Sequence, residues 1–330
     1  MKISILGAGA WGSALSISLA GRHDVTLWTR NAEQLAAMAT SRESAYLPGF
    51  FLPPAVCLEA SLPAALASAE LIISMVPTAG FRAVLHQVAQ SGTDAPVIWA
   101  CKGFEAGSAK LPHQIVQEVL RSRIPHGVLS GPSFAQEVAA GLPTALTLAA
   151  QDAAFAQEMA ARLHAPRLRI YASDDVVGVE VGGAVKNVMA IAAGICDGMG
   201  FGHNARAALI TRGLAEITRL GLALGGKMET FLGLTGVGDL ILTCTGDLSR
   251  NRAVGQRLAR GQQLTDILRE LGHVAEGVTT AREVSRLAER EGVDMPITRA
   301  VCRVLYEAMP ASAAVEELLN REPKMENGPA

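Results

Sequence analysis

The feature that most constrains this 330-residue chain is a glycine-rich segment at its N-terminus, ISILGAGAWGSALSISLA at residues 3–20. Gly7, Gly9 and Gly12 follow a short apolar run with the spacing GxGxxG and precede a helix-forming stretch. In a strand-turn-helix unit, the first glycine permits a tight turn, the second lets a ligand approach the backbone, and the third lets helix and strand pack closely. The helix N-terminus then offers N–H groups to an anion. The segment predicts a dinucleotide-binding unit, and a purely structural turn is the alternative.

Short runs rich in β-branched residues continue through the first half of the chain and alternate with helical stretches. They are residues 3–6, 24–28, 71–76, 96–101, 127–130, 144–149 and 168–171. This alternation is typical of parallel βαβ units. Several runs are apolar almost throughout, which indicates strands covered by helices on both faces.

After Asp175 the sequence predicts helices only, at 179–197, 205–224, 250–260, 264–271, 278–291 and 297–308. A chain of this length exceeds the ~250–300 residues at which single cores stop growing. We therefore expect an α/β Rossmann-type doubly wound domain over residues 1–177 and an all-α domain over 178–330. A ligand site between two domains is a common arrangement.

Composition narrows the class of function. The net charge of -2 lacks the positive excess expected of a nucleic-acid-binding protein. The five cysteines are odd in number and form no CxxC pair, which favours the reducing cytoplasm over a disulfide framework or a zinc site. The apolar N-terminus is explained by the glycine motif rather than by a signal peptide, and no membrane span is expected.

Polar residues follow several of the predicted strands, where ligands gather in doubly wound sheets. Arg30 follows the second strand, where NAD-binding proteins have an acidic residue, and so favours the 2'-phosphate of NADP; an ordinary surface arginine is the alternative. Lys102 follows 96–101 and could be a site residue or a surface residue. Gly131 and Ser133 follow 127–130, and Ser133 with Gln136 could be a simple helix cap.

Lys186 is unusual because it lies in a helical run of small and apolar residues, VEVGGAVKNVMAIAAGICDGMGFG at 179–202. Helical spacing places Ala190, Ala193 and Asp197 on its face, so that small side chains leave room for a ligand near its ammonium group. A lysine that extends its head to solvent is the alternative.

A second polar group occurs in GVGDLILTCTGDLSRNRAVG, residues 236–255, which contains Asp239, Ser249, Arg250, Asn251 and Arg252. This mixture suits recognition of phosphate and hydroxyl groups. The alternative is a helix start capped by Ser249.

Several of these segments together resemble the bacterial biosynthetic NAD(P)-dependent sn-glycerol-3-phosphate dehydrogenase family. The segments that carry the resemblance occur in the family's order: GAGAWGSAL, KG at 102–103, SGPSFAQE, GGAVKNVMAIAAGICDGMGFGHNARAALITRGLAE, GVGDLILTCT, SRNR, and VAEG at 274–277. The match spans about residues 3 to 305. The resemblance implies a Rossmann domain followed by a helical domain like that of 6-phosphogluconate dehydrogenase.

The resemblance also implies roles for individual residues. Lys186 matches the family's catalytic proton carrier. The implied substrate-binding residues are Lys102, Gly131, Ser133, Lys186, Asp239, Ser249, Arg250 and Asn251. The implied cofactor-binding residues are Gly7, Gly9, Trp11, Gly12, Arg30, Lys102, Ala135, Arg250, Val274 and Glu276. Many relatives have Ser or Thr in place of Ala10, and some have Tyr or Phe in place of Trp11, so we expect no side-chain contact from Ala10 and a contact of shape from Trp11.

The implied reaction is reversible reduction of dihydroxyacetone phosphate to sn-glycerol 3-phosphate by NADP(H) or NAD(H), which supplies the glycerophospholipid backbone. Lys186 would donate the proton, its pKa lowered by burial and by Lys102 and raised by Asp239 or Asp197. The expected partner is a small phosphorylated substrate, with no nucleic acid and no metal; a homodimer is one option. Two alternatives remain: a hydroxy-acid dehydrogenase related to 6-phosphogluconate or 3-hydroxyisobutyrate dehydrogenase, and a catalytically silent NADP(H)-sensing protein.

Overall fold

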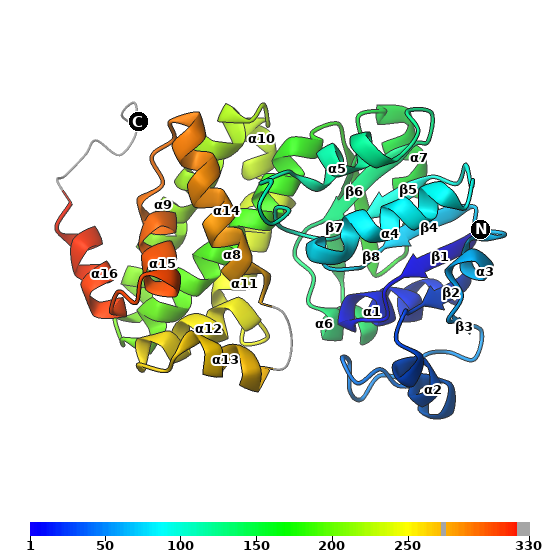
Figure 1. Ribbon diagram of the computed structural model, residues 1–330, viewed down its shortest axis with the longest axis horizontal. Helices are drawn as coiled ribbons and strands as arrows, with labels where there is room; N and C mark the ends of the chain where they lie inside the picture. The colour runs from blue at the N-terminus through cyan, green and yellow to red at the C-terminus, as the bar shows by residue number, and fades with distance from the viewer. Residues whose placement is uncertain (272–274, 322–330) are drawn as a thin grey trace. The chain divides into compact units, whose positions relative to one another are not determined.

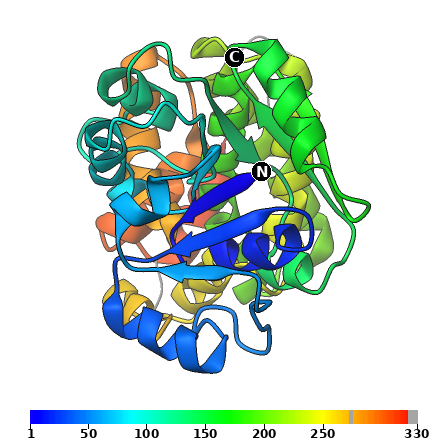
Figure 2. The ribbon, with the colours of Figure 1, turned by 90° about the vertical axis from the view of Figure 1, so that its right-hand side faces the viewer.

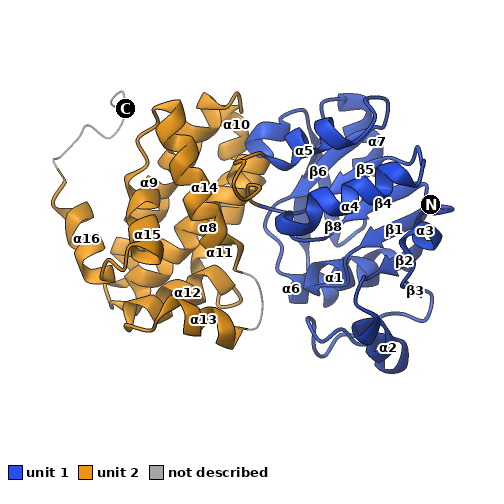
Figure 3. Cartoon of the chain, viewed as in Figure 1, with its two compact units in different colours: residues 1–102, 111–179 blue, residues 103–110, 180–330 orange. Residues whose placement is uncertain are grey.

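The computed structural model describes residues 1–271 and 275–321. They divide into two compact units (Figure 3). Unit 1 comprises residues 1–102 and 111–179, and unit 2 comprises residues 103–110 and 180–330. The segment that directly follows Lys102 is therefore grouped with the helical unit.

Unit 1 is built on an 8-stranded sheet with the order β3-β2-β1-β4-β5-β6-β7-β8. The strands are β1 (Lys2–Leu6), β2 (Asp24–Trp28), β3 (Cys57–Glu59), β4 (Leu71–Ser74), β5 (Val97–Trp99), β6 (His126–Ser130), β7 (Thr144–Ala149) and β8 (Leu168–Ser173). All seven predicted strands are present. The sequence missed β3, a three-residue edge strand without an apolar run, and it missed that β6 and β7 pair antiparallel.

Helices cover both faces of this sheet (Figures 1 and 2). They are α1 (Ala10–Leu19), α2 (Ala32–Ser41), α3 (Leu62–Leu66), α4 (Thr78–Gln90), α5 (Pro112–Val119), α6 (Ala135–Ala139) and α7 (Ala153–Leu163). Successive residues of one strand enter different cores: Leu71 and Ile73 belong to one apolar cluster, and Ile72 belongs to another. This explains why the strand is apolar throughout, and it confirms the doubly wound fold.

Unit 2 consists of helices and the short segment 103–110. The helices are α8 (Val176–Gly198), which begins in the last residues of unit 1, α9 (Gly202–Ala223), α10 (Met228–Phe231), the π-helix η1 (Leu234–Gly238), α11 (Asp239–Thr245), α12 (Arg250–Ala259), α13 (Leu264–Leu271), α14 (Glu276–Glu291), α15 (Pro296–Tyr306) and α16 (Ala311–Leu319). The six predicted helices are present with ends that differ by three residues or fewer. The glycines of GVGD at residues 236–239 lie in η1, where a Cβ at Gly236 would be 2.0 Å from the carbonyl oxygen of Phe231.

The small residues of α8 serve helix packing. A Cβ at Gly182 would lie 2.5 Å from the carbonyl oxygen of Thr235, and one at Gly194 would lie 2.0 Å from that of Arg252. Ala190 and Ala193 are fully buried. The stripe that was expected to leave room for a ligand is therefore filled by packing against neighbouring helices.

Among the described residues, α8 is the one single helix with the length and hydropathy of a membrane span. The absence of a continuous apolar run in the sequence, on which the expectation of no membrane span is based, does not detect a helix of this kind. Because 94% of its apolar window is buried inside the protein, it has the character of a core helix.

Candidate active site

The glycine turn after β1 has the geometry that its sequence predicts. Gly7 has φ of 118°, a conformation that favours glycine, and its N–H donates to the carbonyl oxygen of Trp28 at 2.9 Å. A Cβ at Gly12 would lie 1.9 Å from the carbonyl oxygen of Gly7, whereas a Cβ at Gly9 would meet nothing within 4 Å. Gly9 is also the N-cap of α1 and provides no side chain to occupy the helix N-terminus. The turn therefore fits a bound pyrophosphate, which needs exposed N–H groups and close access to the backbone.

The candidate residues of unit 1 follow the carboxyl ends of neighbouring parallel strands. Arg30 follows β2, the glycine turn follows β1, Lys102 follows β5 and Gly131 follows β6, and the β2-β1-β4-β5-β6 order places these strand ends along one edge. Thr78, the first residue of α4 after β4, donates its hydroxyl hydrogen to the carbonyl oxygen of Lys102 at 2.9 Å. Arg30 is exposed, and among the described residues no hydrogen bond or ion pair holds its side chain.

Hydrogen bonds connect Trp11 of α1 to the loop after β6. The indole N–H of Trp11 donates to the carbonyl oxygen of Ser133 at 2.9 Å, and the Ser133 hydroxyl donates to that of Gly131 at 2.9 Å. Gly131 has φ of 132°, where a side chain would be strained. Ser133 does not cap α6, since the N-cap is Phe134, so the alternative of a simple helix cap is wrong.

Lys186 is buried in unit 2, with 8% of its side chain exposed, and is bound on two sides. Its Nζ lies 2.5 Å from Oδ1 of Asp239 and 2.9 Å from Oγ1 of Thr243. The Thr243 hydroxyl group donates its hydrogen to the carbonyl oxygen of Asp239 at 2.6 Å, so Oγ1 of Thr243 is the acceptor of the hydrogen bond from Lys186. A buried ammonium needs such a partner, because desolvation of an unpaired charge is very costly. The alternative of a lysine extended into solvent is wrong.

Helix packing brings these residues together. Gly182 precedes Lys186 by one turn of α8, and Thr235 precedes Asp239 by one turn of the η1–α11 segment. The close approach of Gly182 to the Thr235 backbone therefore sets Lys186 beside Asp239 and, one turn later, Thr243. The site lies directly after a π-helix, an element that is frequent at functional sites.

The first turn of α12 contains the SRNR residues. Ser249 is the N-cap and accepts from the backbone N–H of Arg252 at 3.3 Å, as the capping alternative predicted. Arg250 is exposed on this turn. Asn251 is buried, and its Oδ1 accepts from the backbone N–H of Gly277 at 3.1 Å, which connects α12 to the start of α14. A helix N-terminus with an adjacent arginine is suited to bind an anion.

Three of the remaining candidate residues are the first residues of helices. Ala135 is the first residue of α6, Ala10 the first of α1 and Glu276 the first of α14. Val274 lies outside the described residues. Asp197, considered as a second carboxylate for Lys186, is instead bound to Arg206 and Arg252.

Sequence reasoning missed Thr243. The signal was its position four residues after Asp239 on one helix, which places both side chains on the same face. Cys244 beside it is chemically inert, because burial raises the pKa of its thiol to about 12.

Both halves of the chain match models of one protein family. Residues 2–156 match the N-terminal model of NAD-dependent glycerol-3-phosphate dehydrogenase, and residues 175–316 match its C-terminal model. Glycerol-3-phosphate dehydrogenases (NAD(P)+) of Nitrosospira multiformis and Thiobacillus denitrificans are each 63% identical over 99% of this chain, covering 99% and 100% of those proteins.

A solved structure is also similar to this chain. The crystal structure of glycerol-3-phosphate dehydrogenase from Coxiella burnetii matches with a TM-score of 0.93 and 41% identity, covering 97% of this chain and 99% of that one. The chain carrying this glycine turn and this buried lysine cluster belongs to the NAD-dependent glycerol-3-phosphate dehydrogenase family.

Proposed function

We propose that this chain catalyses the reversible reduction of dihydroxyacetone phosphate to sn-glycerol 3-phosphate with NADPH or NADH. The observation that carries the proposal is the buried contact of Lys186 with Asp239 and Thr243 in a chain of this family. The alternatives of a hydroxy-acid dehydrogenase and of a silent NADP(H) sensor are set aside. The family match covers both halves of the chain, and Lys186 has both of its polar partners, Asp239 and Thr243.

The glycine turn of unit 1 would hold the cofactor. Its pyrophosphate would lie against the backbone at Gly9, where no Cβ intrudes, and against the first N–H groups of α1. Arg30 would bind the 2'-phosphate of NADPH. Trp11, Lys102, Ala135, Arg250, Val274 and Glu276 are the further proposed cofactor residues. The bound nicotinamide supplies the hydride.

Lys186 would act as the proton carrier. As an ammonium ion it donates a proton to the carbonyl oxygen of the substrate, and in the reverse direction the amine removes the proton from the alcohol. Asp239 balances the positive charge, and Thr243 accepts a second hydrogen bond, so together they fix the direction of Nζ. Partners that fix Nζ in this way would lessen the reorganisation needed during the reaction.

The substrate phosphate would be bound at the first turn of α12. Arg250 provides a guanidinium group suited to paired hydrogen bonds with phosphate, and Ser249 and Asn251 lie beside it. Lys102, Gly131 and Ser133 are the proposed substrate residues of unit 1. The chemistry of these residues suits a phosphate group, and the ketone is the substrate that the family match supports.

We further propose that residues 1–177 form the dinucleotide-binding domain and residues 178–330 the substrate domain. The described cysteines form no disulfide, which supports the cytoplasm as the compartment. A homodimer is the proposed assembly, and light scattering in solution tests it.

The decisive experiment follows NADPH oxidation with two substrates, dihydroxyacetone phosphate and dihydroxyacetone, in the wild type and Arg250→Ala. We expect the wild type to use dihydroxyacetone very poorly, because binding energy from the phosphate orients the reacting carbonyl. Arg250→Ala should lower kcat and raise KM for the phosphorylated substrate and hardly change the reaction with dihydroxyacetone.

Arg260→Ala provides a matched control, since Arg260 is an exposed arginine just past the other end of α12. If Arg250→Ala affected both substrates equally, Arg250 would not bind the substrate phosphate and would act only as a cofactor or structural residue. If the wild type oxidised neither NADPH nor NADH with dihydroxyacetone phosphate, the proposed reaction itself would be wrong.

A further inference from the structure

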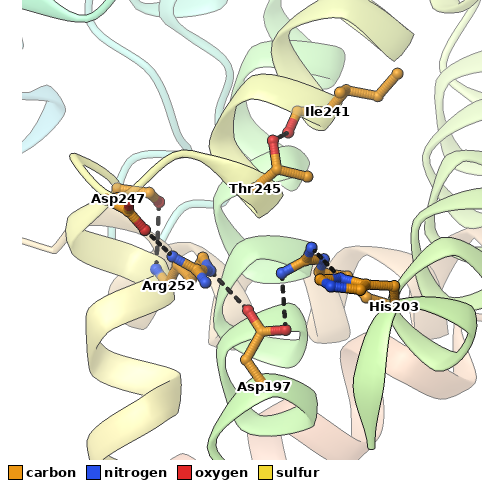
Figure 4. A network of polar contacts seen from close by, with 8 residues as sticks. Asp197, His203, Ile241, Thr245, Asp247 and Arg252 are labelled. Carbon is orange, nitrogen blue, oxygen red and sulfur yellow. Dashed lines mark hydrogen bonds and ion pairs between the residues drawn. The ribbon is translucent and has the colours of Figure 1, made fainter.

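Asp197 lies at the centre of an ion-pair network that joins three helices of unit 2 (Figure 4). Its Oδ2 is 2.7 Å from Nε of Arg252 on α12, and its Oδ1 is 3.0 Å from a terminal nitrogen of Arg206 on α9. Arg252 also contacts Asp247, in the loop before α12, at 2.9 Å. Only 12% and 13% of the Arg252 and Asp197 side chains are exposed, whereas that of Asp247 is 96% exposed.

Neither charge of the Asp197–Arg252 pair stabilises its own helix. Asp197 is in the last turn of α8, where the helix dipole disfavours a negative charge, and Arg252 is in the first turn of α12, where it disfavours a positive charge. Each placement is unfavourable for the helix that carries the charge. Within this pair, each charge is compensated by its partner on the other helix. The contact therefore acts on how α8 and α12 are aligned with each other.

The two helices also touch through their backbones. A Cβ at Gly194 of α8 would lie 2.0 Å from the carbonyl oxygen of Arg252, and one at Gly255 of α12 would lie 2.0 Å from that of Ile191. Glycine contacts set the distance between helices, but they have no side chain to prevent one helix from sliding or rotating on the other. The directional bond from Nε of Arg252 to Asp197 supplies that restraint.

This alignment links the two parts of the proposed site. Lys186 is on α8, and Arg250 and Asn251 are in the same turn of α12 as Arg252. We infer that Asp197 is a positioning residue, which acts through Arg252 to hold the phosphate-binding turn of α12 at a fixed place relative to Lys186. The inference rests on the proposed function, because it requires Arg250 to bind the substrate phosphate.

The test is Asp197→Asn, which keeps the size of the side chain and removes its charge. We expect kcat/KM for dihydroxyacetone phosphate to fall about 10- to 100-fold, the range typical of a misplacement of up to 1 Å. The value for dihydroxyacetone should stay unchanged, since it has no phosphate to be positioned. Loss of folded protein would lower kcat/KM for both substrates equally. The ratio of the two kcat/KM values therefore separates a positioning role from a structural one.

Arg252→Gln breaks the same pair from the other side and should reproduce the effect, and the double variant should be no worse than either single variant. Two controls should resemble the wild type: Asp247→Asn, which removes the exposed partner of Arg252, and Arg206→Gln, which removes the partner of Asp197 on α9.

Comparison with Arg250→Ala shows whether a negative result contradicts the positioning role of Asp197 or the proposed phosphate site. If Asp197 acts through the phosphate-binding turn, adding Asp197→Asn to Arg250→Ala should change the reaction with dihydroxyacetone phosphate little. If Arg250→Ala shows the phosphate-specific loss and Asp197→Asn does not, the positioning role is wrong and the proposed function stands. If Arg250→Ala shows no such loss, the proposed phosphate site is wrong, and the inference fails with it.

Discussion

The buried Lys186 shows how the chain keeps a cation inside a packed helical unit. The nearest carboxylate oxygen is 2.5 Å away, and the threonine oxygen that completes the contact has its own hydrogen directed elsewhere. Both partners lie on a single helix, four residues apart. Helix geometry therefore sets the spacing of the two groups that hold the Lys186 ammonium.

We expect Lys186→Ala to bind NADPH normally and to lose turnover by about 10²–10⁴-fold, the usual contribution of general acid-base catalysis. Lys186→Arg should also be inactive, because guanidinium does not release its proton near neutral pH. Steady-state kinetics and NADPH titration measure both effects. Lys227→Ala, an exposed lysine of the same unit, is the control, and wild-type kcat in Lys186→Ala would remove Lys186 from the mechanism.

Arg30→Asp should shift cofactor preference from NADPH toward NADH. The change removes a partner for the 2'-phosphate and introduces an acceptor for the 2'-hydroxyl of NADH. The measurement is the NADPH/NADH ratio of kcat/KM. Arg167→Asp makes the same charge change at another exposed position of unit 1 and should leave the ratio unaltered. An unaltered ratio in Arg30→Asp would mean that Arg30 is only a surface residue.

At the scale of the helices, a buried carboxylate from another helix caps the N-terminus of α15. Glu216 of α9 accepts hydrogen bonds from the backbone N–H groups of Ile297 and Thr298, at 2.6 and 3.1 Å, and from the Thr298 hydroxyl at 3.0 Å. Burial raises the pKa of Glu216 to about 7, although these hydrogen bonds and the nearby Arg219 favour the charged form. The cap of α15 therefore changes charge near neutral pH.

This gives a stability change with a defined sign. Since the pKa of Glu216 is about 7 in the folded protein and 4.5 ordinarily, the folded state holds the proton more tightly. The stabilisation that this tighter proton binding gives the folded state is fully present below the ordinary pKa of 4.5. It is lost as the pH rises through the folded-state pKa of about 7. Relative to Glu216→Gln, which cannot ionise, the wild type should lose about 3 kcal/mol of unfolding free energy over this range.

Urea unfolding of the two proteins between these pH values measures the difference. Glu229→Gln, a change at an exposed carboxylate of unit 2, should follow the wild type at every pH. A constant difference between wild type and Glu216→Gln would show that Glu216 does not titrate in this range.

At the scale of the whole molecule, spectroscopic signals divide between the units. All three tryptophans, Trp11, Trp28 and Trp99, lie in unit 1, so intrinsic fluorescence reports on that unit. Far-UV circular dichroism is dominated by helices, which make up most of unit 2. Because unit 1 also contains helices α1 to α7, the dichroism signal is weighted toward unit 2 rather than confined to it, and the two signals differ in how much each unit contributes.

We expect NADPH to raise the fluorescence-detected unfolding midpoint more than the midpoint detected by circular dichroism. A ligand at a hundred times its Kd stabilises the state that binds it by about 2.7 kcal/mol, and most proposed cofactor residues are in unit 1. Lys186→Ala should keep this shift. Equal shifts in both signals would mean that the units unfold as one.

The sequence by itself determined the alternation of strands and helices apart from the edge strand β3, the glycine turn and the identity of the family. These follow from local features: Gly7 needs positive φ, Gly12 excludes a Cβ, and the periodicity of apolar residues differs between strands and helices. Thr243 was within reach of the same reasoning, because helical spacing from Asp239 is a local property.

The tertiary structure alone decided what the small residues and the second carboxylate of α8 do. Gly182 and Gly194 contact η1 and α12, and Asp197 binds Arg252 rather than Lys186. No local pattern encodes these choices, because the partners are more than 50 residues apart and meet only when the helices pack. The antiparallel pairing of β6 and β7 is of the same kind, since strand direction in a sheet depends on where the chain returns.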